Sequence, residues 1–354
     1  MTLNVKQSAV CLVLMLGMLS MTTFGSNKDR TGTAGAQELL IPVGARGVAL
    51  GLTGSLFVNG VDAIYWNPAG LCKMDNAVQV MFSQMSYIAD INVSYGAIGV
   101  NAGDFGTLGF ALKSISFGDI PVTTVEFPDG TGSSYNPTFL TLGVTYSKSL
   151  TDRISVGINA DLVSERILEM SATGLSFDIG IQYRDLALRG LQLAVAIKHI
   201  GPNMKFGGSN AYVTGTADQA SLRGSNPYVA EMASFEMPSN LEIGIGYSPK
   251  LDELNGLTVG GTFINNNYLQ DEYSLGAEYK YNNMFFVRGG YMFSPQTSKD
   301  VDVYGTTSRS YLYDFTAGAG VRYNVGGVDL SFDYAYRNVK YLSGNHVFTV
   351  AAGF

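Results

Sequence analysis

Apolar and polar side chains alternate along several stretches of the chain, and this alternation constrains the fold more than any other feature. In residues 173–184 the apolar positions are Leu175, Phe177, Ile179, Ile181 and Tyr183, and serine, aspartate, glycine and glutamine stand between them. The same pattern recurs in residues 153–165, 238–248, 272–281 and 327–337. Since successive side chains of a β-strand point to opposite faces, a period of two predicts strands with one apolar face and one polar or small face.

The composition also favours β-structure. The chain of 354 residues contains 43 Gly, 21 Tyr and 19 Phe but only 14% charged residues, whereas coiled coils and helical bundles need far more Lys, Glu and Arg. Its 22 basic residues do not cluster and are outnumbered by 29 acidic ones. Nucleic acid is therefore not an expected partner.

The N-terminus carries the longest apolar stretch. Lys6 precedes the apolar residues 9–21, which are too few to span a bilayer comfortably. We expect residues 1–25 to be a signal peptide that is cleaved on export. Beyond it no stretch of 18 or more apolar residues occurs, so no transmembrane helix is predicted. A soluble exported protein and an outer-membrane barrel both remain possible.

Strand number and loop lengths favour the barrel. Fourteen strands are expected near residues 77–84, 93–101, 105–116, 136–148, 153–165, 173–184, 190–199, 238–248, 256–267, 272–281, 284–293, 311–323, 327–337 and 344–354. Connections after even strands are all short, whereas those after odd strands include 117–135, 200–237 and 294–310. Short periplasmic turns and long external loops are typical of bacterial outer-membrane barrels. We therefore predict an all-β fold, a transmembrane antiparallel β-barrel over residues 77–354.

The predicted location implies two partners. Outer-membrane lipid would surround the barrel. In the last strand His346, Phe348, Val350, Ala352 and Phe354 share one face. A terminal strand of this kind resembles the signal by which the barrel assembly machinery recognises outer-membrane proteins.

The inner face and residues 26–76 are expected to fill the lumen. Fourteen strands enclose a space too wide for wall side chains alone to fill. Inward-facing charges of both signs favour salt bridges across the lumen over a dedicated ion path; they include Asp161, Asp178, Glu242, Arg288 and Asp333. Residues 26–76 show no alternation, so we expect them to form a plug inside the barrel.

Three motifs within residues 35–71 resemble a known family. They are GAQELL at 35–40, VGARGVALG at 43–51 and DAIYWNPAGL at 62–71. These motifs resemble the N-terminal signature of the PorV/PorQ family, which belongs to the FadL-like fourteen-stranded barrels. The resemblance implies an N-terminal hatch with an Asn-Pro-Ala turn, and our count of fourteen strands rests partly on it.

The Asn-Pro-Ala triplet has a mechanical interpretation. Pro68 fixes its own φ and restricts Asn67, whose amide can bond nearby backbone, so that Asn67, Pro68 and Ala69 form a rigid corner. Trp66 adds bulk, and Arg46 is expected to pair with a lumen acid such as Asp178 or Asp333. The resemblance implies that this corner closes the barrel until a ligand or partner shifts it. An ordinary turn before the first strand is the alternative.

Enzyme chemistry is not expected. The only histidines, His199 and His346, fall in the lipid-facing register near external strand ends. No Ser or acidic residue is spaced to support them, and no His/Cys cluster suggests a metal. We expect no catalytic residues, metal or cofactor.

The long loop 200–237 is the remaining candidate for function. It carries Phe206, Tyr228 and Phe235 among Gly, Ser and Asn. These residues could capture an apolar ligand, dock an exported protein or fold back as a lid.

Two functions compete. By the PorV/PorQ resemblance, the barrel engages exported proteins in type IX-like secretion or surface attachment. The alternative is FadL-like transport of hydrophobic small molecules across the outer membrane. A largely structural barrel is a third possibility.

Overall fold

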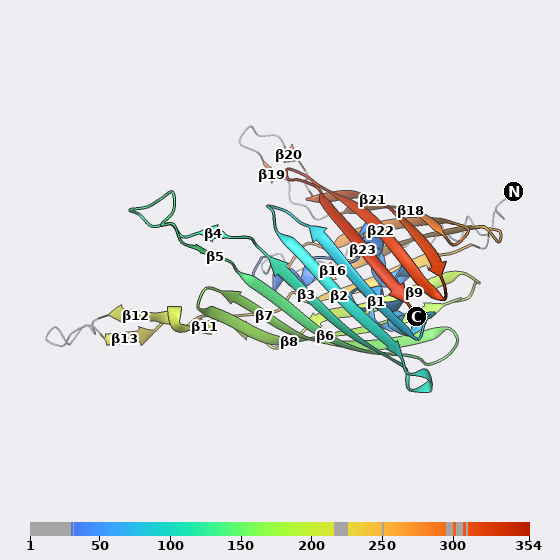
Figure 1. The fold of residues 1–354 in the computed structure, drawn as a ribbon, viewed down its shortest axis with the longest axis horizontal. Helices are drawn as coiled ribbons and strands as arrows, with labels where there is room; N and C mark the ends of the chain where they lie inside the picture. The colour runs from blue at the N-terminus through green and yellow to red at the C-terminus, as the bar shows by residue number, and fades with distance from the viewer. Residues whose placement is uncertain are drawn as a thin grey trace.

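Fourteen long strands close into one antiparallel barrel (Figure 1). The computed structural model describes residues 30, 32–215, 226–249, 251–294, 300–301, 307–308 and 311–354, so the predicted signal peptide 1–25 lies outside the described residues. The barrel strands are β1 Val78–Ser86, β2 Asn92–Asn101, β3 Thr107–Ser116, β6 Thr138–Ser149, β7 Ile154–Ile167, β8 Met170–Arg184, β9 Leu191–Ile200, β15 Asn240–Tyr247, β16 Asn255–Asn266, β17 Glu272–Tyr281, β18 Phe285–Phe293, β21 Tyr313–Val325, β22 Val328–Val339 and β23 Asn345–Gly353. Each pairs with its neighbour in sequence, and pairing of β1 with β23 completes the ring. The predicted fold class and strand order are confirmed.

The outer face of the barrel is apolar. On β8, Leu175, Phe177, Ile179 and Ile181 are 40–48% exposed, while Ser176, Asp178 and Gln182 between them are buried in the lumen. A closed sheet satisfies its backbone groups within itself, so this apolar surface can face hydrocarbon at little cost. The protein is a bacterial outer-membrane barrel.

The described helices are all short. None is long and apolar enough to cross a membrane.

The long connections all leave one end of the barrel, which we assign to the outside. They carry two-stranded ribbons, β4 Ile120–Pro121 with β5 Ser134–Tyr135, β10 Met204–Lys205 with β14 Ser234–Phe235, β12 Tyr212–Gly215 with β13 Asn226–Val229, and β19 Asp300–Val301 with β20 Thr307–Ser308. The ribbons β4–β5 and β12–β13 extend well beyond the barrel (Figure 1). Shorter elements are β11 Gly207–Gly208, which pairs with β8, η6 Ser209–Ala211 nearby, and η5 Gly103–Phe105 in a periplasmic turn.

Residues 32–76, the lumenal segment, lie inside the barrel. They form η2 Gln37–Leu40, α2 Ala45–Ala49, α3 Gly54–Phe57, η3 Gly60–Asp62, α4 Ala63–Trp66 and η4 Pro68–Lys73. At the external end Gly32 N donates to Tyr268 O, and at the periplasmic end Ala77 N donates to Phe354 O. The segment thus runs through the lumen from the external end to the periplasmic end of the barrel. That it blocks passage as a plug stays a prediction.

A register shift on β9 corrects one prediction. Phe177 pairs with Ile200 and Ile179 with Ile197, so β9 has one residue more than β8 between these pairs. The extra residue is accommodated by a positive φ of 59° at His199. Lys198 and His199 therefore both point inward, with side chains only 3% and 4% exposed. The prediction that His199 faces lipid is wrong because a bulge interrupts the period of two. His346 is exposed on the outer face.

Candidate functional site

The Asn-Pro-Ala corner is held against the barrel wall by the side chain of Asn67. The fully buried Asn67 accepts from Ala69 N through Oδ1 at 3.1 Å, and its Nδ2 donates to Ser55 O at 3.1 Å and to Ile181 O on β8 at 3.4 Å. Gly157 on β7 and Gly180 on β8 face the corner, and a Cβ atom at either would overlap it. The missing side chains let the corner approach the wall closely.

Trp66 packs the lumenal segment against itself. Its side chain is 3% exposed, and its Nε1 donates to Val43 O at 3.0 Å. Gly47 of α2 and Gly54 of α3 contact the indole ring so closely that neither position has room for a Cβ atom. The tryptophan therefore joins the two short helices, each of which is too short to be stable alone.

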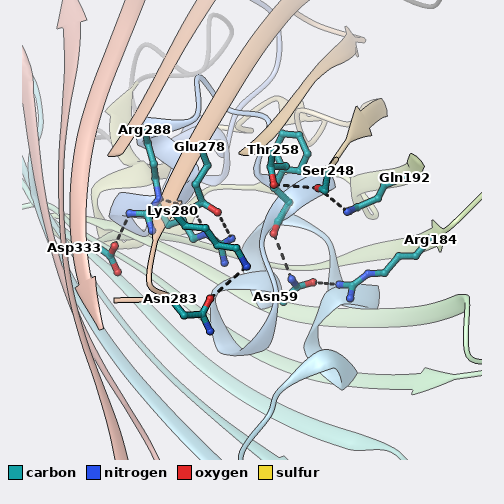
Figure 2. Close-up of polar contacts among 12 residues, drawn as sticks. Asn59, Arg184, Gln192, Ser248, Thr258, Glu278, Lys280, Asn283, Arg288 and Asp333 are labelled. Atoms are coloured by element: carbon teal, nitrogen blue, oxygen red, sulfur yellow. Dashed lines mark hydrogen bonds and ion pairs between the residues drawn. The ribbon is translucent and has the colours of Figure 1, made fainter. Parts of the chain in front are cut away.

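Arg46 pairs with an acidic residue of the lumen, as predicted, but this residue is Glu278 and not one of the two acids named as examples. Its guanidinium donates to both carboxylate oxygens of Glu278 on β17, at 3.0 and 3.1 Å. Arg288 on β18 donates to the same Glu278 at 2.6 Å and also pairs with Asp333 on β22. The predicted partners Asp178 and Asp333 are therefore wrong for Arg46, although Asp333 belongs to the same network. Figure 2 shows Glu278, Arg288 and Asp333 together on the inner wall.

The periplasmic side of the lumenal segment is polar. A cavity of about 360 Å³ lies there, and its lining includes Arg46, Asn59, Arg184, Gln192 and Lys280. Asn59 of the segment accepts from Arg184 on β8, and Gln192 bonds Ser248 at 3.2 Å (Figure 2). This vestibule offers little apolar surface to a ligand.

The external side contains a cavity with an apolar wall, which we name the outer cavity. Its volume is about 540 Å³. One wall comes from the external ends of β1, β2, β3 and β6 and is formed by Tyr87, Ile91, Ile115, Phe117 and Phe139. The rings of Phe117 and Phe139 meet edge to face at 4.8 Å. Residues 35–42, Leu52, Tyr65 and Trp66 of the lumenal segment form the floor.

The remaining wall of the outer cavity is mostly polar, although Ile264 and Leu269 also belong to it. It includes Glu165, Lys198, Asn240, Glu242, Asn266, Glu272 and Arg337. Lys198 Nζ lies 3.4 Å from Glu242 and 4.3 Å from the centre of the Tyr65 ring. Arg337 is 1% exposed, donates to Asn345 at 2.9 Å and stacks on Tyr313.

The floor of the outer cavity carries one strongly perturbed acid. Burial raises the pKa of Glu38 in η2 to about 8, and the nearby Glu165 carboxylate adds to the rise. Lys113 Nζ donates to the backbone oxygens of Glu38 and Ile41, both at 2.6 Å. Protonation of Glu38 is thus linked to docking of the floor against the wall.

The structure separates the lumen charges that the sequence analysis grouped together. Asp161 and Asp178 flank Asn159, whose Nδ2 donates to them at 2.8 and 3.4 Å, and Asp178 also accepts from His199 N at 2.7 Å. Glu242 lies in the outer cavity. Arg288 and Asp333 lie in the Arg46 network. Among the residues that the structure describes, no group of three or more His, Cys, Asp or Glu could hold a metal ion.

The aromatic residues of the long external loop do not form the cavity. The rings of Phe206 and Phe235 lie 5.7 Å apart and are tilted by 37°, and they pack with Ala36, Leu39 and Met204 over the start of the lumenal segment. Tyr228 is 42% exposed on the projecting ribbon β12–β13. This arrangement favours the lid among the three interpretations of the loop.

Trp66 and Glu242 of the outer cavity were named from the sequence, whereas its apolar wall was not predicted. On β3 the inward positions change from Lys113 to the apolar Ile115, and Phe117 follows at the external end. Such a change from polar to apolar inward residues at the external end of a strand indicates a binding surface, because apolar side chains exposed to water there favour an apolar contact.

The comparisons with known proteins agree on the fold. The Pseudomonas putida toluene transporter TodX matches with a TM-score of 0.55 and 13% identity, over 86% of this chain and 96% of that chain. The Ralstonia pickettii toluene transporter TbuX matches with a TM-score of 0.53 and 14% identity, over 88% of this chain and 98% of that chain. The CymD monoaromatic hydrocarbon channel matches with a TM-score of 0.50 and 14% identity, over 88% and 97%. These neighbours are FadL-like fourteen-strand outer-membrane barrels. No protein-family model and no curated protein matches the sequence.

Proposed function

We propose that this barrel passes hydrophobic small molecules from the outer surface across the outer membrane. The observation that carries the proposal is the outer cavity, which opens toward the external end and has a wall of aromatic and aliphatic side chains. Burying apolar surface against such a wall is favourable by about 25 cal/mol per Å². A site of this size and character is typical of small-molecule binding.

In this proposal the lumenal segment acts as the predicted plug and moves to let a ligand pass. Its residues Ala45, Val48 and Leu50 are fully buried, and Thr316 on β21 donates to Ala49 O at 2.9 Å. A ligand in the outer cavity touches the floor formed by residues 35–42. Binding can therefore shift the segment if the ligand prefers its displaced state.

The structural neighbours support this role over the secretion role. They are two toluene transporters and a monoaromatic hydrocarbon channel, and none of the three is an enzyme. We accordingly expect a transporter without catalytic activity.

Uptake of butylbenzene into proteoliposomes tests the proposal. Phe139→Ala opens the apolar wall and should weaken binding several-fold and slow uptake, because the ligand loses an aromatic contact. Phe110→Ala on the lipid face of β3, where the side chain is 49% exposed, is the matched control and should leave uptake unchanged. Equal uptake by both variants and by empty liposomes would refute the proposal.

Engagement of exported proteins is the second candidate. It is supported by the motifs in residues 35–71, which resemble PorV/PorQ, and by the exposed Tyr212, Tyr228 and Val229 on β12–β13. Aromatic side chains on a projecting ribbon suit a protein interface. A pull-down with wild type and Tyr228→Ala tests this role, and loss of a specific exported partner in the variant alone would favour it. Recognition of β23 by the barrel assembly machinery and contact with outer-membrane lipid also stay predictions.

A further inference from the structure

The two walls of the outer cavity differ in polarity from one side of the barrel to the other. One row of paired residues crosses β1, β2, β3 and β6 as Met85, Val93, Ile115 and Phe139, and every member is apolar. The row becomes polar on β7, where Phe139 pairs with Glu165. Across the lumen, β9, β15 and β16 place Lys198, Asn240 and Asn266 side by side. A pure hydrocarbon could make favourable contacts with the apolar wall only.

The polar wall contains buried acceptors that lack a donor. Asn240 is 8% exposed and Glu242 is 4% exposed. Asn240 Oδ1 and Glu242 Oε2 make no hydrogen bond within the part of the chain that the structure describes. Buried polar atoms without a partner are costly, so a site containing them favours a ligand that supplies one. What these two atoms lack is a donor.

The charges of the lining do not favour an anion. Four carboxyl side chains, Glu38, Glu165, Glu242 and Glu272, line the outer cavity with two cationic ones, Lys198 and Arg337. Lys198 is already paired with Glu242. Arg337 is the single feature that could attract a carboxylate, and its Nη2 has no hydrogen-bond partner among the described residues. The lining as a whole carries no excess positive charge.

We infer that the outer cavity selects apolar molecules that carry a hydrogen-bond donor, a hydroxyl or amino group, over plain hydrocarbons and over carboxylates. The apolar part lies against Ile115, Phe117 and Phe139, and the donor reaches Asn240 Oδ1 and Glu242 Oε2. This inference rests on the proposed function, because it names the class of small molecule that the same cavity takes.

Four molecules of one shape test the inference. 4-Butylphenol, 4-butylaniline, butylbenzene and 4-butylbenzoate are titrated by calorimetry into the full-length barrel in lipid nanodiscs, and heats from empty nanodiscs are subtracted. The phenol and the aniline should bind about three- to tenfold more tightly than the hydrocarbon, as expected for one net hydrogen bond. The benzoate should bind most weakly.

Variants at Asn240 test whether this residue accepts the hydrogen bond from the donor group of the ligand. Asn240→Leu should weaken binding of the phenol and the aniline about three- to tenfold and leave that of butylbenzene within about twofold, because only the acceptor is lost. Asn240→Asp keeps an acceptor and should retain the preference. Gln192→Leu, in the periplasmic vestibule, is the matched control and should change nothing.

The outcomes separate the inference from the proposed function. Binding of butylbenzene as tight as that of the phenol, or tightest binding of the benzoate, overturns the inference and leaves the proposed function standing. A phenol preference that persists in Asn240→Leu overturns the assignment of the donor to this wall. If none of the four molecules binds beyond the empty nanodiscs, both fail.

Discussion

Replacing Asn67 by alanine should loosen the Asn-Pro-Ala corner from the barrel wall. The substitution removes the acceptor of Ala69 N–H and the donors to Ser55 O and Ile181 O. Ser55 O also accepts a hydrogen bond from Gln182 Nε2 at 3.2 Å, so it still has one donor when the Asn67 amide is removed. The Ala69 N–H becomes an orphan in a fully buried position.

The expected cost follows from these contacts. A buried donor without a partner costs about 1–3 kcal/mol, and the weaker lost contact to Ile181 O adds about 1 kcal/mol. The corner should therefore be destabilised by about 2–4 kcal/mol, which corresponds to about a 30-fold to nearly 1000-fold larger population of the undocked corner.

Hydrogen–deuterium exchange of residues 60–73 in nanodiscs measures this population. Exchange in Asn67→Ala should accelerate by about the same factor, because exchange follows local opening. Asn59→Ala, which removes the contacts of a half-buried side chain to Arg184 and to Phe57 O, is the control and should have a much smaller effect. If both variants exchange like wild type, the corner is not held by its side-chain hydrogen bonds and our reasoning is wrong.

Three further predictions address the membrane face, the floor of the outer cavity and the lumen. Ile179→Arg, at a lipid-facing position near the middle of β8, should destabilise the barrel by about 2–4 kcal/mol in detergent-free unfolding. Phe105→Arg, in a periplasmic turn, is the control and should destabilise it by only about 0–1 kcal/mol. Equal destabilisation by the two variants would contradict the assigned register. Docking of the floor favours the protonated form of Glu38, so docking should weaken as pH rises from 4.5 to about 8. Hydrogen exchange of residues 32–42 measures this docking, and Glu38→Gln should abolish its pH dependence. A protection factor, corrected for the intrinsic pH dependence of amide exchange, that stays constant from pH 5 to 9 in wild type would refute the link. Deletion of residues 32–76 should raise conductance in planar bilayers, and unchanged conductance would refute the plug.

The strands could be predicted from the sequence because the barrel imposes one repeating constraint. Each inward residue is followed by a lipid-facing one, so this pattern, together with the family resemblance that supported a count of fourteen, located the strands to within three residues at every end. Residues 272–281 coincide with β17. The charged inner face followed from the same constraint.

The bulge at His199 could not be predicted in this way. A single extra residue in β9 reverses the facing of the position after it, and the local sequence Lys198-His199 reads equally well in either register. Only the pairing with β8, and the contact of His199 N with Asp178, fix which residues face inward.

The contacts of the lumenal segment could not be predicted from the periodicity of the sequence either. Arg46 selects Glu278 among several lumen acids because of where α2 lies, and that placement depends on wall glycines such as Gly276 and Gly290, which contact Leu50 and Gly51. The outer cavity lies between the start of this segment and the external ends of β1, β2, β3 and β6. Its two walls come from strands far apart in the sequence, so no single motif indicates it.

The direct test of the central claim is to locate a ligand in crystals of the full-length barrel grown with 4-bromophenol. Bromine can be identified by its anomalous scattering, independently of the surrounding density. We predict one dominant bromine peak in the outer cavity against Ile115 and Phe139, with the hydroxyl directed toward Asn240. A dominant peak in the periplasmic vestibule or on the external ribbons, with none in the outer cavity, would contradict the account.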